Sequence, residues 1–191
     1  VGSVQIQNSG TLAGNLCNAS PAADGMPPLL TLDASVELAS PAGIRVVPLS
    51  DFVLGVRQTA LRPAELVSAI LLPEVSATAT GSFIKIGARK YLVISITMVA
   101  ALISVVSGRI IEARVAVGAC SAVAQRVPLL EAALLGCGVA DAVDQIHPAH
   151  LEQLSPISDM RGSAQYRGEA ALELCRRAVT GALQDGARCN G

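Results

Sequence analysis

The fold class is decided by residues 91–117, YLVISITMVAALISVVSGRIIEARVAV. The first half of this stretch is apolar except for Ser95, Thr97 and Ser104, and it is shorter than the about 20 residues that a membrane-spanning helix needs. β-branched residues occur in both halves, and the tripeptide SGR at 107–109 between them is a turn signal. We therefore expect a buried β-hairpin with one strand on each side of this turn, and no membrane span.

Strand patterns dominate on the N-terminal side of this hairpin, and helix patterns dominate on its C-terminal side. A strand at 82–88 would extend the hairpin to an antiparallel sheet of three or four strands. Further strands are predicted at 36–38, at 44–47 and, fully buried, at 66–72, with an irregular connection at 48–55. Helices are predicted at 125–135, at 140–154 with a break at Pro148, and at 163–183, with Gly186 ending the last one. Strands followed by helices are typical of an α+β fold rather than of a doubly wound sheet.

The composition limits the classes of function. The chain has 191 residues, of which 51% are hydrophobic and 15% are charged, so it can form one large domain or two small ones around a real core. A formal net charge of −1 offers no basic surface to a nucleic acid. The five cysteines lack C-x-x-C spacing, which predicts free buried thiols in a cytoplasmic protein rather than a metal site.

Residues 10–15, GTLAGN, form the most informative motif. A backbone of small residues can direct several N–H groups toward a phosphate, and Thr11 and Asn15 would add side-chain hydrogen bonds. The alternative is an ordinary loop of small residues. Asp24 follows on the C-terminal side and suits the sugar hydroxyls of a nucleotide better than its phosphates. The alternative for Asp24 is a helix N-cap before Pro27.

Other polar residues give weaker signals. Lys85, Arg89 and Lys90 could steer an anionic cofactor, with Lys85 and Arg89 on one face of a strand, or they could be solvated charges at a strand end. His147 and His150 lack an acidic or cysteine partner at metal-ligand spacing. Neither a G-x-S-x-G motif nor a P-loop is present, so the sequence assigns no metal ligand and no catalytic residue.

Five segments, taken in order, resemble the flavin-binding subunit of the molybdenum hydroxylases. This family includes the medium subunit of carbon monoxide dehydrogenase-like enzymes and the flavin domain of xanthine dehydrogenase. The resemblance covers nearly the whole chain and depends on the order and spacing of the segments. They are VGSVQIQNSGTLAGNLCNASPAAD, GIRVVPLSDF, RPAELVSAILLP, SFIKIGARKYLVISI and LSPISDMRGSAQYRGEAALELCRR.

The resemblance implies an FAD site. The T-x-G-G-N turn that binds the FAD pyrophosphate in the family matches Thr11, Ala13, Gly14 and Asn15, with alanine at the first glycine position. The aspartate that contacts the ribityl chain matches Asp24, the apolar residue beside the isoalloxazine matches Val67, and the lysine beside the flavin matches Lys85. The chain departs from the family's Q-I-R-N at 5–8, where it has QIQN.

The resemblance also implies the domain organisation. The family's flavin subunit begins with another lobe carrying an A-G-G-T turn, which has no match in this sequence. Residues 1–75 are therefore expected to be the second lobe of a two-lobed FAD-binding domain, without the N-terminal lobe. Residues 76–185 would be a C-terminal domain with an antiparallel sheet packed against helices, and 186–191 a tail.

The implied function is that of an FAD-dependent oxidoreductase subunit. It would pass electrons from [2Fe-2S] clusters through FAD to an acceptor, next to a molybdopterin-binding large subunit and an iron–sulfur small subunit. The isolated chain would be inactive. The alternative is a truncated assembly module of such a complex that binds no flavin.

Overall fold

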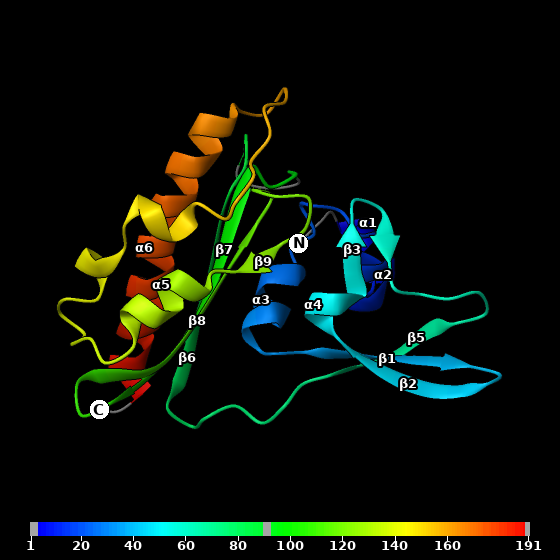
Figure 1. The fold of residues 1–191 in the computed structure, drawn as a ribbon, viewed down its shortest axis with the longest axis horizontal. Helices are drawn as coiled ribbons and strands as arrows, with labels where there is room; N and C mark the ends of the chain where they lie inside the picture. Colours follow the sequence, from blue (N-terminus) through cyan, green and yellow to red (C-terminus); the bar gives the residue numbers. More distant parts are fainter. Residues whose placement is uncertain (1–3, 90–92, 190–191) are drawn as a thin grey trace.

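The structure is a computed structural model that describes residues 4–89 and 93–189, with side chains through residue 184. Its elements form two groups, the first with a three-stranded and a two-stranded β-sheet and the second with a four-stranded β-sheet (Figure 1). The first group contains α1 (Val4–Ser9), α2 (Leu12–Cys17), α3 (Met26–Thr31), β1 (Ser35–Ser40), β2 (Gly43–Pro48), α4 (Leu49–Phe52), β3 (Val53–Gly55), β4 (Gln58–Thr59) and β5 (Leu66–Leu71). The second group contains β6 (Ala79–Ile86), β7 (Thr97–Val106), β8 (Arg109–Gly118), β9 (Gln125–Arg126), α5 (Pro128–Leu134), the 3₁₀ helices η1 (Val143–Gln145) and η2 (Pro148–Leu151), and α6 (Ala164–Cys189).

The long hairpin predicted from the sequence forms the centre of the second sheet. β7 and β8 pair antiparallel, ending with Val106 opposite Arg109. The two turn residues, Ser107 and Gly108, both have positive φ, at 50° and 74°, as a two-residue type I′ turn requires. The sheet order is β6-β7-β8-β9, so the predicted antiparallel sheet is confirmed. All but the last two residues of β7 are buried, which explains its uninterrupted apolar run.

Helix α6 covers one face of this sheet and packs against β6 and β7 (Figure 1). Its buried face consists largely of small residues such as Ala171, Ala178 and Ala182, which let the helix backbone approach the strands closely. At Gly181 an added Cβ would lie 2.7 Å from the Ser82 hydroxyl oxygen. The helix continues past Gly186, so the prediction that this glycine ends it is wrong. A single glycine costs a helix only about 1 kcal/mol.

The first group is built on a three-stranded sheet of order β2-β1-β5. The β1–β2 hairpin confirms the two strands predicted there. Val36 and Leu38 of β1 face a core that also contains Leu16 and Phe52. The prediction that 66–72 is fully buried is wrong, because β5 is an edge strand in which exposed and half-buried residues mostly alternate.

Two further boundaries differ from the sequence prediction. The helix expected at 125–135 begins only at Pro128, because the two residues of β9 pair with β8 instead. Proline at the first helical position is favourable because the missing N–H has no partner there in any case. Residues 48–55, expected to be irregular, include α4 and β3. The division at residue 75 and the tail at 186–191 stay predictions.

The two groups meet at α3, which packs on β7, β8 and β9 (Figure 1). Arg114 of β8 donates to the Thr31 carbonyl at 3.2 Å and pairs with Asp33 at 2.9 Å. Arg126 of β9 donates to the Leu30 carbonyl at 3.3 Å and also pairs with Asp33, at 2.7 Å. The last carbonyls of a helix lack partners within the helix, so these two arginines satisfy them from the other group.

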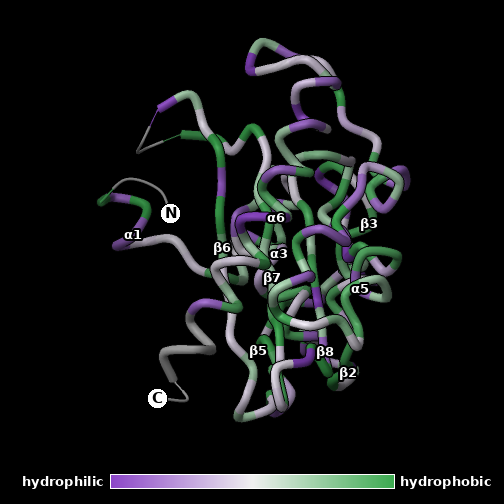
Figure 2. The backbone as a smooth tube through the Cα atoms, turned by 90° about the vertical axis from the view of Figure 1, so that its left-hand side faces the viewer, coloured by the Kyte–Doolittle hydropathy of each residue, from purple (hydrophilic) through white to green (hydrophobic). Residues whose placement is uncertain are grey.

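Helix α1 has no buried residue and lies at one side of the molecule (Figure 2). Of the apolar run at 91–106, residues 97–106 form the strand β7, and residues 91 and 92 lie outside the described residues. Among the described residues, no helix has the length and hydropathy that a membrane crossing requires.

Burial of the β7 side chains predicts a large effect of truncation in that strand. Met98→Ala should lower the free energy of unfolding by about 2–5 kcal/mol, since Met98 is 0% exposed and its removal leaves a cavity. Met160→Ala is the matched control, because Met160 is 94% exposed, and it should change stability by less than about 0.5 kcal/mol. Urea denaturation of both variants measures this, and equal effects would contradict the buried position of β7.

Candidate functional site

The motif at 10–15 forms the start of a short helix rather than an irregular loop. Thr11 is the N-cap residue of α2, and its hydroxyl oxygen accepts a hydrogen bond from the Gly14 N–H at 2.9 Å. Thr11 and Gly14 are exposed, whereas Ala13 is half-buried. The first N–H groups of a helix have no carbonyl partner within it, so this end of α2 can donate hydrogen bonds to an anion.

Asn15 connects α2 to the loop that carries Asp24. Its side-chain oxygen accepts a hydrogen bond from the Gly25 N–H at 3.1 Å. A Cβ added at Gly25 would lie 2.8 Å from this same oxygen, so the close approach of the two segments requires glycine. In the part of the chain that the structure describes, the Asn15 amide nitrogen makes no other hydrogen bond.

Asp24 is nearly buried, and both of its carboxylate oxygens have partners from the second group. Lys85 Nζ lies 2.5 Å from Oδ2, and the Ser95 hydroxyl donates to Oδ1 at 2.5 Å. The alternative role of Asp24 as a helix N-cap is wrong, because α3 begins after Gly25 and has no side-chain cap. Asp24 instead forms a bridge between the two groups.

Lys85 lies on β6 opposite Met98 and is about a quarter exposed. The expectation that Arg89 shares its strand face is wrong, since β6 ends at Ile86. Lys90, the third cation of the predicted cluster, lies outside the described residues. Within the described part of the cluster, Lys85 forms an ion pair with Asp24.

Val67 lies apart from these polar contacts. It is a half-buried residue of β5, pairs with Leu38 of β1 and packs against the core of the first group. Helix α2 contacts the same strand. The structure thus links Thr11, Gly14, Asn15, Asp24 and Lys85 through a series of neighbouring contacts, and Val67 lies on the strand that α2 contacts.

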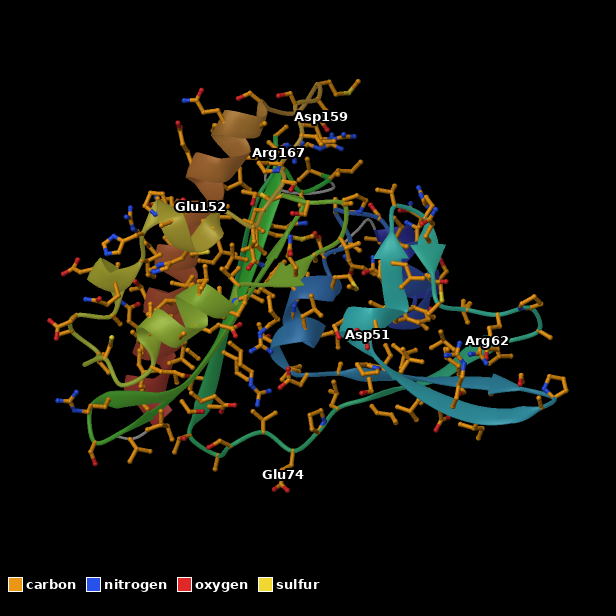
Figure 3. The ribbon with its side chains drawn as sticks, in the orientation of Figure 1. Asp51, Arg62, Glu74, Glu152, Asp159 and Arg167 are labelled. Atoms are coloured by element: carbon orange, nitrogen blue, oxygen red, sulfur yellow. The ribbon has the colours of Figure 1, made fainter. Side chains whose placement is uncertain are left out.

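Two residues near Asp24 were not assigned from the sequence. Ser95 is one of them. Arg167 of α6 is the other: its guanidinium is buried and donates to the carbonyls of Ile96 and Ala119, and its Nη2 lies 2.8 Å from Asp159 (Figure 3). Its Nε has no partner among the described atoms. The sequence signal that could have indicated Arg167 is the position of an arginine next to the apolar stripe of a predicted helix.

Arg167 lines a cleft of about 440 Å³ between the two groups. Ser20 and Val56 of the first group face Ser95, Ala119 and Asp159 of the second across this cleft. Hydrogen bonds from the Arg161 N–H and from the Arg167 guanidinium lower the pKa of Asp159 to about 2. The lowered pKa shows that the carboxylate form of Asp159 is stabilised by the fold.

The cysteines and histidines among the described residues form no metal site. Cys120 and Cys175 are buried free thiols, and burial raises the pKa of Cys175 to about 12. Cys17 is exposed, so the prediction of buried thiols is wrong for that residue. His150 Nδ1 accepts a hydrogen bond from the His147 N–H at 3.3 Å, which is a local contact in η2.

The lowered pKa of Asp159 predicts a pH dependence of stability. A folded-state pKa of about 2, below the ordinary 3.8, means that its contribution is present above about pH 4 and is lost as the pH falls toward 2. Asp159→Asn should remove this part of the acid destabilisation. Glu65→Gln is a control at a second carboxylate with a pKa of about 2. In this variant the loss of stability that comes from protonating Asp159 should remain. Urea denaturation midpoints measured between pH 2 and 6 test this. A midpoint that falls as steeply with falling pH in Asp159→Asn as in the parent would contradict it.

Comparisons with known proteins show what the chain is similar to. Residues 1–75 match the FAD binding domain in molybdopterin dehydrogenase, and residues 82–182 match the CO dehydrogenase flavoprotein C-terminal domain. The nicotine 6-hydroxylase medium subunit of Paenarthrobacter nicotinovorans is 33% identical over 96% of this chain and 63% of its own length. The carbon monoxide dehydrogenase medium chain of Afipia carboxidovorans is 32% identical over 92% of this chain and 61% of its own length.

Solved structures give the same result. CO dehydrogenase from Oligotropha carboxidovorans superposes with a TM-score of 0.90 at 28% identity, over 96% of this chain and 64% of the matched one. Quinoline 2-oxidoreductase from Pseudomonas putida 86 gives a TM-score of 0.86 at 30% identity, over 97% of this chain and 65% of the matched one. The chain thus spans slightly less than two thirds of the length of these relatives. It belongs to the family of flavin-binding subunits of the molybdenum hydroxylases.

Proposed function

We propose that this chain holds FAD and passes electrons from [2Fe-2S] clusters to an acceptor within a cytoplasmic molybdenum hydroxylase complex. The observation that carries this proposal is the Asp24–Lys85 pair at the junction of the two groups, next to the N-terminus of α2. The partners would be a molybdopterin-binding large subunit and an iron–sulfur small subunit. FAD supplies the redox chemistry when bound, and the protein binds and orients it.

The residues present fit the chemistry of FAD. The Ala13 N–H at the start of α2 suits a pyrophosphate, and the unpaired amide nitrogen of Asn15 can donate to the same group. Thr11 and Gly14, which are bonded to each other through the Thr11 hydroxyl, would shape the turn beside it. The Asp24 carboxylate accepts hydrogen bonds, as ribityl hydroxyls require, and each of its oxygens retains a second lone pair.

Two further assignments follow from the same site. The Lys85 ammonium, close to Asp24, would stabilise negative charge on the reduced flavin electrostatically. Val67 would pack against the isoalloxazine, since it is an apolar and incompletely buried side chain on the strand that contacts α2. Both residues would then act on the ring, whereas the residues of α2 act on the pyrophosphate.

A second candidate function is that of an assembly module that binds no flavin. It is favoured by the outer face of the first sheet, where Ile44, Val46 and Leu66 are more than half exposed. Exposed aliphatic side chains that share one face of a sheet are typical of protein–protein contacts. Flavin binding distinguishes the two candidates directly.

The test is an FAD titration of the purified chain, followed by flavin fluorescence, alone and with a separately produced N-terminal flavin lobe of a relative. The double variant Asn15→Ala/Asp24→Ala should weaken FAD binding by about 100-fold, because it removes two hydrogen-bonding groups, one of them charged. Asp51→Ala, an exposed aspartate on α4 (Figure 3), is the control and should bind like the parent.

Two outcomes would contradict the proposal. Unchanged FAD affinity in the double variant would remove Asn15 and Asp24 from the site. Absence of FAD binding by the parent, with and without the added lobe, would favour the assembly module.

A further inference from the structure

Ser95 has a buried hydroxyl that donates a hydrogen bond to Asp24. The flavin site proposed above gives this bond no role. Ser95 is 2% exposed and lies just before β7, and its hydroxyl donates to Asp24 Oδ1 at 2.5 Å. An ionised carboxylate can only accept, so the proton of this bond is that of the serine. A length of 2.5 Å is typical of a strong O–H···O⁻ hydrogen bond.

Ser95 and Lys85 constrain Asp24 differently. The lysine ammonium is at the end of a long flexible side chain, and it lies at Oδ2. The serine hydroxyl is one bond from its Cβ, and it lies at Oδ1. With a donor on each oxygen the carboxylate plane is fixed, and the second lone pair of each oxygen stays available for another donor.

Ser95 is itself held in place by its neighbour Ile96. The Ile96 N–H donates to the Ile86 carbonyl at 2.7 Å, and the Ile96 carbonyl accepts from the buried Arg167 guanidinium. Arg167 also donates to the carbonyl of Ala119, whose N–H bonds to Pro21 in the loop that leads to Asp24. Both segments that meet at Asp24 are therefore anchored to α6.

We propose that Ser95 is a positioning residue that holds the Asp24 carboxylate in the orientation required by the ribityl hydroxyls of FAD. This inference rests on the proposed function for the flavin and deepens it. Ser95 does not contact the cofactor in this account. It acts through Asp24, so its effect depends on the presence of that carboxylate.

The first experiment needs no flavin. The carboxyl carbon of Asp24 is followed by NMR in the parent, in Ser95→Ala and in Ser104→Ala. Ser104 is the matched control, because it is also buried and donates to a carboxylate, Glu112 at 3.1 Å, at the opposite end of β7. The Asp24 signal should move in Ser95→Ala and coincide with the parent in Ser104→Ala. An Asp24 signal that does not move in Ser95→Ala overturns the inference.

The second experiment is a double-mutant cycle on FAD affinity, in the chain supplied with the N-terminal flavin lobe of a relative. Ser95→Ala should weaken FAD binding about tenfold, as expected when a hydrogen bond to a charged group is removed. In the Asp24→Ala background the same substitution should have an effect of less than about twofold. Ser104→Ala should also have less than about a twofold effect.

The outcomes separate the inference from the proposed function. A tenfold loss that persists in the Asp24→Ala background means that Ser95 acts elsewhere, and it overturns the inference. A parent that binds no FAD, together with a moved Asp24 signal in Ser95→Ala, contradicts the proposed function and supports the positioning of Asp24 by Ser95. Urea midpoints of both serine variants check that the fold is equally stable.

Discussion

The contact of α3 with the four-stranded sheet is the constraint on which the rest of the structure depends. Pro27 of α3 and Met98 of β7 come so close to Gly118 that an added Cβ there would lie 3.0 and 2.5 Å from their side chains. Arg114 and Arg126 bind the other end of the same helix through its carbonyls and Asp33. These contacts act together to set one relative position of the two groups.

That position determines whether the proposed flavin site can form. Asp24 precedes α3 by two residues, whereas Lys85 and Ser95 belong to the strands and loops of the second sheet. Neither group alone contains both Asp24 and Lys85, the carboxylate and the cation that pair at this site. Charge pairs of this kind are effective only when their atoms are held at hydrogen-bond distance, so a small rotation at α3 would separate them. The buried Arg167 reinforces the same geometry from α6.

Local patterns in the sequence predict the parts of this architecture that depend on local physics. The apolar β-branched run with its Ser-Gly turn predicts the β7–β8 hairpin, and the order of elements predicts an α+β fold. The exposure of β5 depends on what packs against its sheet, so it could not be predicted from 66–72 alone. The bond between Ser95 and Asp24 joins residues 71 positions apart, and no periodicity in either segment indicates it. The residues proposed to bind the flavin were predicted through resemblance to a family, whereas the pairing of Asp24 with Lys85 is seen only in the fold.

The proposed flavin site is assembled from both groups across α3. Hydrogen–deuterium exchange with and without FAD, in the chain supplied with the N-terminal flavin lobe of a relative, tests this assembly. FAD should slow exchange both at the amides of Gly14 and Gly25 and along β6 around Lys85. Protection confined to the first group, with β6 exchanging as in the flavin-free protein, would contradict it.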